Sequence, residues 1–155
     1  MGRKTKLVQI ADGSPDEKSP AYNRDHGKTY LLTEMSATQG QRWAMRGLLA
    51  LGRGNVEVPP DLANAGMAGW AIMGLQMISK LSFAEADSLL EELMGCVQVM
   101  PDPANPMVVR RLVESDVEEI TTRVRLQKEV FALHGNFSVA ESLSMLTSGI
   151  SAQAS

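Results

Sequence analysis

Residues 60–80 form a stretch rich in Met and Gly that is apolar on every side when it is placed on a helix. Pro60 lies at its start, and proline suits the first turn of a helix because its φ angle is already helical. One face carries Leu62, Gly66, Gly69, Trp70, Met73 and Met77, while Met67, Leu75 and Ile78 occupy much of the other. In a water-soluble protein such a helix is buried on both sides. The stretch therefore predicts a central core helix or a helix that docks on a partner.

Charge and hydropathy argue against two classes of partner. Asn64 and Gln76 interrupt the apolar stretch, and its uninterrupted part is shorter than the about 20 residues that a transmembrane helix needs. The formal net charge of −3 is too small to indicate a surface for nucleic acid or anionic lipid. We therefore expect neither a membrane span nor a nucleic-acid partner.

Four more helices are predicted from capping boxes, in which a Ser is followed three residues later by Glu or Gln. The boxes begin at Ser36, Ser82, Ser115 and Ser138, and predict helices over about residues 37–51, 83–96, 116–134 and 139–146. The helix of residues 116–134 has two apolar stripes. We expect the main one to face the core: Val117, Ile120, Val124 and Phe131. The smaller one contains Leu126, Val130 and Leu133.

Short β-branched and aromatic runs predict strands over about residues 6–11, 28–35, 96–100 and 107–113. The turn Pro101–Pro106, which holds three prolines, favours a hairpin between the last two runs, with the Tyr30 strand as a third member. The expected fold class is α+β and mostly α-helical. We expect about five helices around a central apolar helix, together with a small antiparallel β-sheet.

A length of 155 residues suits one domain with a single core. Residues 12–27 are rich in Gly, Pro, Ser, Asp and Asn, and we expect residues 1–27 to form an extended or flexible arm. Residues 28–147 form the expected globular domain, and residues 148–155 a flexible tail.

The residues that could carry chemistry are few and dispersed. His26 and His134 lie far apart in the sequence, and His134 suits the negative end of a helix dipole. Cys96 has no basic neighbour in the sequence to activate it, which favours a buried and inert thiol. The chain contains no zinc-ligand spacing, calcium loop, P-loop or nucleophile elbow. We therefore expect no enzyme activity, no cofactor and no metal site.

Several runs of the chain resemble, in order, a family of tailed-bacteriophage proteins called tail assembly chaperones. The first runs are Gly27–Ala37 and Arg42–Leu51. The later runs are Pro101–Pro103, Val108–Leu112, Asp116–Arg123 and Glu129–Phe137. The resemblance covers roughly residues 27–147 and rests on structural runs rather than on an active-site motif.

The resemblance implies a phage morphogenesis protein of the bacterial host cytoplasm that binds the tape-measure protein, the tail-tube protein or both. Our candidates for the partner-binding surface are Met67, Trp70, Met73 and Met77, with the stripe Leu126, Val130 and Leu133 as a second candidate. Both sets also suit a core. The alternative is a structural virion component, such as a tail-tip, connector or decoration protein, whose arm orders against a neighbouring subunit. The chain could also form a homo-oligomer.

Overall fold

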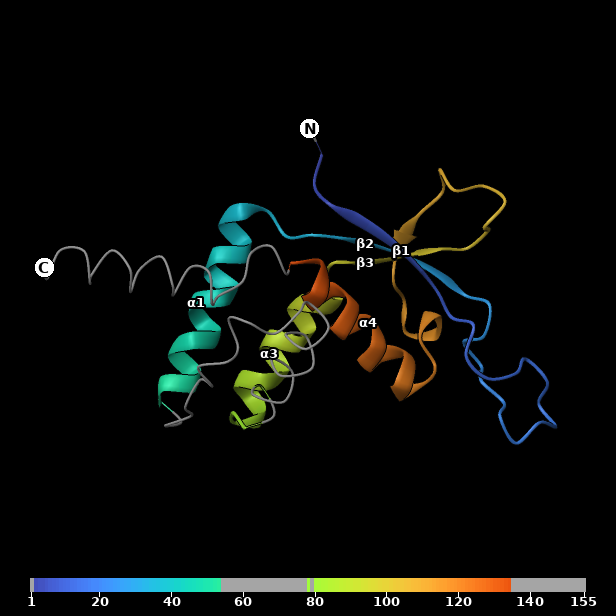
Figure 1. The fold of residues 1–155 in the computed structure, drawn as a ribbon, viewed down its shortest axis with the longest axis horizontal. Coiled ribbons are helices and arrows are strands. Elements are labelled where there is room, and N and C mark those ends of the chain that lie inside the picture. The colour runs from blue at the N-terminus through green and yellow to red at the C-terminus, as the bar shows by residue number, and fades with distance from the viewer. Residues whose placement is uncertain (1, 54–77, 79, 135–155) are drawn as a thin grey trace, which may run out of the picture. The chain divides into compact units, whose positions relative to one another are not determined.

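The computed structural model describes residues 2–53, 78 and 80–134 (Figure 1). Its contacts divide the chain into two compact units. The first, which we call the sheet unit, combines Met1–Glu34 with Leu90–Leu133. The second combines Met35–Leu89 with His134–Ser155.

The sheet unit contains four antiparallel strands in the order β1-β2-β3-β4. Their bounds are Thr5–Gln9 for β1, Thr29–Thr33 for β2, Val97–Met100 for β3 and Arg110–Arg111 for β4. A short 3-10 helix, η2 (Glu114–Asp116), and the helix α4 (Ile120–Leu133) follow β4. The predicted hairpin and its third strand are thus confirmed, and β1 adds a fourth strand at one edge of the sheet.

One face of the sheet is covered by α4, which packs on β1 and β2 (Figure 1). Side chains alternate between the two faces of a strand, so every second residue faces the helix. Lys6 lies on this covered face, where its ammonium group pairs with Glu129 of α4. The core between sheet and helix contains the buried side chains Val8, Ile10, Tyr30, Leu32, Val97, Val99, Leu126 and Val130. The opposite face carries Thr5, Leu7 and Gln9 of β1, which are exposed.

Residues 11–27, predicted as part of an extended arm, form a closed loop between β1 and β2. The backbone N–H of Ser14 donates to the Ala21 carbonyl at 2.8 Å, and the N–H of Asn23 donates to the Ser14 carbonyl at 2.8 Å. Gly13 has a φ of 76°, and a Cβ placed there would lie 2.6 Å from the Ala21 carbonyl oxygen. The loop therefore requires glycine at this position.

The second unit contains the helix α1 (Ala37–Arg53) and the first residues of α3 (Phe83–Met94), whose last residues belong to the sheet unit. The Trp43 Nε1 donates to the Leu89 carbonyl at 3.0 Å. The Met35 backbone N–H donates to His134 Nε2 at 2.7 Å, so this histidine acts as a structural acceptor.

The predicted arrangement of about five helices around a central helix is wrong. The described residues contain three α-helices and a four-stranded antiparallel sheet. Almost all of the predicted central helix of residues 60–80, and all of the predicted helix of residues 139–146, lie outside the described residues. In the sheet unit, the core lies between the sheet and α4. The prediction failed because helical periodicity shows that a face is buried but does not show what it packs against.

Capping boxes located two helix starts correctly and one wrongly. The hydroxyls of Ser36 and Ser82 accept the backbone N–H groups of Gln39 at 3.2 Å and Glu85 at 3.3 Å, as the capping box requires. Ser115 starts no α-helix, because it lies within η2 and α4 begins at Ile120.

The expected core stripe of the predicted helix of residues 116–134 is also wrong. Ile120 is 83% exposed and Val124 is 45% exposed, while Leu126 and Val130 of the smaller stripe are fully buried. Both stripes are apolar, so periodicity alone could not tell which one the sheet covers.

Candidate functional site

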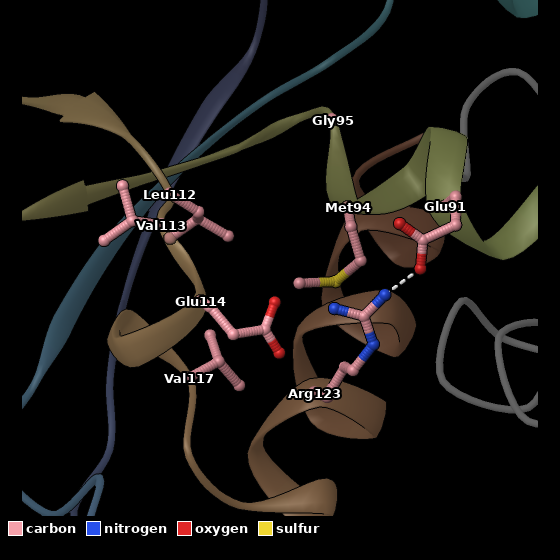
Figure 2. Close-up of a pocket in the computed structure, with 8 residues that line it drawn as sticks. All are labelled: Glu91, Met94, Gly95, Leu112, Val113, Glu114, Val117 and Arg123. Carbon is pink, nitrogen blue, oxygen red and sulfur yellow. Dashed lines mark hydrogen bonds and ion pairs between the residues drawn. The ribbon is translucent and has the colours of Figure 1, made fainter.

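The sheet unit has an open groove beside α4, which we call the α4 groove (Figure 2). Its volume is about 480 Å³. Its apolar lining comes from the end of α3 and from the segment that joins β4 to α4: Met94, Leu112, Val113 and Val117. Met94 is buried and Val113 is exposed, and the charged Glu91, Glu114 and Arg123 line the groove beside them, so its lining is mixed rather than apolar.

Charged side chains lie on the rim of the α4 groove. Arg123 of α4 pairs with Glu91 of α3, and in Figure 2 the Glu114 carboxylate points into the groove from the opposite wall. Among the described residues, the structure gives Glu114 no ion-pair partner. The lining therefore carries one surplus negative charge, which would favour a positively charged group in the groove.

The apolar surface continues from the groove along α4. Ile120 and Arg123 are i,i+3 neighbours, and Ile120 and Val124 are i,i+4 neighbours, so all three lie on one side of the helix. Ile120 and Val124 are exposed large apolar residues on a helix that buries other residues against the sheet. The groove and these two residues together offer apolar and charged groups on one side of α4, a combination that protein interfaces also have.

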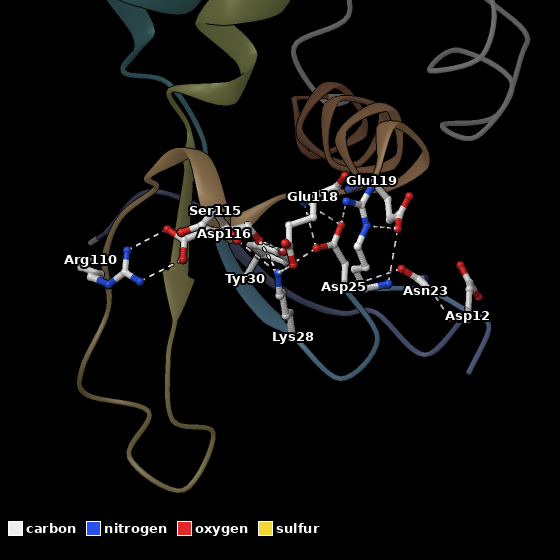
Figure 3. Close-up of polar contacts among 11 residues, drawn as sticks. Asp12, Asn23, Asp25, Lys28, Tyr30, Arg110, Ser115, Asp116, Glu118 and Glu119 are labelled. Carbon is white, nitrogen blue, oxygen red and sulfur yellow. Dashed lines mark hydrogen bonds and ion pairs between the residues drawn. The ribbon is translucent and has the colours of Figure 1, made fainter. Parts of the chain in front are cut away.

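The wall of the groove is held in place by Asp116 (Figure 3). Its carboxylate accepts two bonds from Arg110, from Nη1 at 2.7 Å and from Nη2 at 2.9 Å, and one from the Val113 backbone N–H at 2.6 Å. Its carbonyl oxygen accepts the hydroxyl of the buried Tyr30 at 2.6 Å. These bonds tie residues 113–116 to the sheet and set the position of Val113 and Glu114.

The start of α4 is held by Asp25, which is fully buried in the loop before β2. Its carboxylate accepts the backbone N–H of Glu118 at 3.0 and 3.1 Å and that of Glu119 at 2.9 Å. These are the free N–H groups at a helix start, so Asp25 caps α4 from a distant part of the chain. Lys28 Nζ donates to the same carboxylate at 2.8 Å and to Glu118 at 3.1 Å.

Both structural carboxylates are stabilised in their charged form. The Arg110 guanidinium holds the pKa of Asp116 below its ordinary value against the opposing effect of burial. Burial raises the pKa of Asp25, but hydrogen bonds from Lys28 and from the N–H groups of Glu118 and Glu119 outweigh it and leave a lowered pKa. Neither group is therefore arranged to exchange a proton near neutral pH, and we assign both a positioning role.

A second hollow of about 410 Å³ lies on the other side of the start of α4. It is lined by the loop between β1 and β2, including Asp12 and Tyr22, and by Thr121, Thr122 and Arg125 of α4. Arg125 donates to Asp12 at 3.2 Å and joins the two walls. We regard this hollow as part of the contact between loop and helix.

None of the described residues that the sequence suggested as a binding surface lines the α4 groove. Met67, Trp70, Met73 and Met77 lie outside the described residues. Leu126 and Val130 are fully buried and therefore serve the core, while Leu133 is partly buried. Sequence reasoning missed the α4 groove and Asp25. One signal for the groove was available in the sequence: α4 has two apolar stripes, and a single sheet can cover only one of them.

The structure also shows the surroundings of Cys96 and of the possible metal ligands. Burial, with a smaller contribution from Glu92, raises the pKa of the Cys96 thiol to about 11, so the thiolate is scarce at neutral pH. Within the described part of the chain, no group of three or more His, Cys, Asp or Glu side chains could hold a metal ion. No described helix has both the length and the apolar character needed to cross a membrane.

Comparisons with protein-family models, with curated proteins and with solved structures find no match to this chain. They provide no relative from which a function could be transferred.

Proposed function

We propose that this chain is a non-catalytic bacteriophage morphogenesis protein, a tail assembly chaperone that binds the tape-measure protein, the tail-tube protein or both. It would act in the cytoplasm of the bacterial host while tails are assembled. The family resemblance over residues 27–147 suggests the class of protein, and the α4 groove suggests how binding occurs.

One observation carries the binding proposal: α4 leaves Ile120 and Val124 exposed, and Arg123, one turn after Ile120, lines a groove that contains both apolar and charged side chains. Exposed apolar surface rimmed by polar residues is typical of protein interaction sites. The groove is wide enough for a few large side chains but open, which suits a segment of protein chain better than an enclosed small molecule. We expect an apolar segment flanked by Lys or Arg, because the groove holds the Glu114 carboxylate, which no described residue pairs.

The test is co-purification from cells that produce the phage tail. The tagged protein and two variants are compared by quantitative mass spectrometry of the tape-measure and tail-tube proteins that they capture. Ile120→Glu places a charge on the proposed surface. Met107→Glu is the matched control, because Met107 is an apolar residue that is 89% exposed, as Ile120 is 83% exposed. Met107 lies in the turn region between β3 and β4. We expect Ile120→Glu to lose the tail proteins and Met107→Glu to keep them; equal capture by both variants contradicts the proposal.

The second candidate function is a structural virion component. It is favoured by β1, an edge strand with an exposed face that a neighbouring subunit could cover. The protein inventory of purified particles separates the two candidates. A chaperone is absent from mature virions or present only in trace amounts, whereas a structural component is present in a fixed ratio to the tail-tube subunit.

A further inference from the structure

In the described part of the chain, β1 is an edge strand whose backbone groups at every second residue have no strand partner. The Lys4 carbonyl accepts the Glu34 N–H at 2.9 Å, and the Ile10 N–H donates to the Lys28 carbonyl at 3.0 Å. In antiparallel pairing, the residues between these two alternate in the direction of their backbone groups. The even-numbered residues therefore bond to β2, and the N–H and C=O groups of Thr5, Leu7 and Gln9 point away from the sheet.

The two edges of the sheet differ in how they are protected. The opposite edge is β4, which has two residues, both of them arginine. Short and charged edge strands prevent pairing with other chains. β1 has five residues and no proline, and Leu7 at its centre is 56% exposed. Lysine also protects edges, but the Lys6 side chain pairs with Glu129 on the covered face and leaves the edge open.

We propose that β1 pairs with β1 of a second copy of this chain, antiparallel and with Leu7 opposite Leu7, so that two sheets join into one. In this register the two strands overlap over their full length. Thr5 faces Gln9, and each facing pair can exchange two backbone hydrogen bonds. The arrangement has two-fold symmetry, in which the same patch serves both copies. The inference goes beyond the proposed function and does not depend on it.

Charge excludes the registers shifted in one direction, and the shorter overlap of the two five-residue strands disfavours those shifted in the other. Only odd-numbered residues have free backbone groups, so the register can shift only in steps that keep odd opposite odd. Shifts in one direction place Lys6 opposite Lys6 or Lys4 opposite Lys6, and directly opposed like charges are unfavourable. With Leu7 opposite Leu7, Lys6 faces Val8 and Lys4 faces Ile10. The two Lys6 side chains are then diagonal neighbours, each already paired with its own Glu129.

The ends of the strand are also complementary to a second copy. Arg3 and Lys4 precede β1, and Asp12 follows it. Antiparallel pairing brings the basic end of one strand beside the acidic end of the other. The contact is small against the about 1,200–2,000 Å² of a stable protein interface, so we expect a weak, reversible dimer with a dissociation constant in the micromolar range.

The experiment is sedimentation velocity of the full chain over concentrations from low micromolar to millimolar. The wild type should pass from monomer to dimer. Leu7→Pro removes only an outward N–H and is compatible with an edge strand, so it should remain folded by circular dichroism and lose the dimer. Leu7→Lys places two ammonium groups opposite each other and should weaken the dimer at least tenfold.

A mixing experiment keeps the test decisive if one variant folds poorly. In the proposed register, Leu7→Lys and Leu7→Glu chains should each dimerise more weakly than the wild type and should form a tighter heterodimer when mixed, because opposite charges then face each other across the two-fold axis. A wild type that stays monomeric at all concentrations overturns the proposal. A dimer that is insensitive to both Leu7→Pro and Leu7→Lys also overturns it, because the contact then lies elsewhere.

Discussion

The carboxylate of Asp25 accepts the backbone N–H of Glu119 at 2.9 Å, although the two residues are 94 positions apart in the chain. The same carboxylate accepts the N–H of Glu118 and the ammonium group of Lys28. One buried side chain therefore joins the loop before β2 to the start of α4. This bond sets where α4 begins, and with it where Ile120 and Arg123 lie beside the α4 groove.

Removing this cap should destabilise the sheet unit. Asp25→Ala leaves the N–H groups of Glu118 and Glu119 without their acceptor and removes one of the carboxylates that pair with Lys28. We expect the free energy of unfolding to fall by about 2–4 kcal/mol. Urea denaturation followed by circular dichroism measures it. Glu17→Ala is the control, since Glu17 is an exposed carboxylate in the same loop. Equal stability of the two variants would show that Asp25 is no structural cap.

Acid should weaken the fold through Asp116. A carboxyl whose pKa is lower in the folded than in the unfolded chain adds stability above its unfolded pKa of about 4, and this stability is lost as the pH falls through the folded value. Asp116→Asn should therefore be much less stable than the wild type at pH 7. The difference should shrink when the pH is lowered below about 4. Urea denaturation of both proteins at the two pH values measures it, and a difference that stays constant would contradict the role of this charge.

The two sides of α4 should respond differently to substitution. Ile120→Glu and Val124→Glu alter exposed positions, so we expect changes in the free energy of unfolding within about 0.5 kcal/mol. Leu126→Ala removes a fully buried side chain and should cost about 2–5 kcal/mol. Thermal and urea unfolding of the three variants give the comparison. Strong destabilisation by Ile120→Glu would mean that the exposed stripe is part of the core.

The Cys96 thiol should react slowly in the folded protein. Burial raises its pKa to about 11, so little thiolate is present at neutral pH. Alkylation by iodoacetamide, followed by mass spectrometry, should be slow in buffer and much faster in urea. Fast alkylation of the folded chain would instead indicate an activated cysteine and would reopen the question of catalysis.

Local patterns predicted the elements of the fold better than their assembly. The β-branched run around Tyr30 and the proline-rich turn after Met100 identified three strands and the hairpin, because strand propensity and turn chemistry act over a few residues. Ser36 and Ser82 marked helix starts for the same reason. Asp25 gave no such signal, since its partners lie about 90 residues later and a charged residue in a loop is usually solvated.

The site was harder to predict than the fold. Periodicity identified both apolar stripes of α4 but could not show that the sheet covers Leu126 and Val130 and leaves Ile120 exposed. The α4 groove depends on how the end of α3 lies beside residues 112–117 and Arg123, and on the Arg110–Asp116 pair that holds one wall. A single sequence contains no local pattern for such a surface.

The central claim is that the exposed side of α4 and its groove bind tail proteins. The most direct measurement is the affinity of purified wild type, Ile120→Glu and Met107→Glu for purified tape-measure and tail-tube proteins, by biolayer interferometry. We predict that Ile120→Glu weakens binding to at least one of the two proteins by about tenfold or more, as for a residue at the centre of an interface, while Met107→Glu binds as the wild type does. The claim would be contradicted if Ile120→Glu bound both proteins as tightly as the wild type does, or if the wild type bound neither.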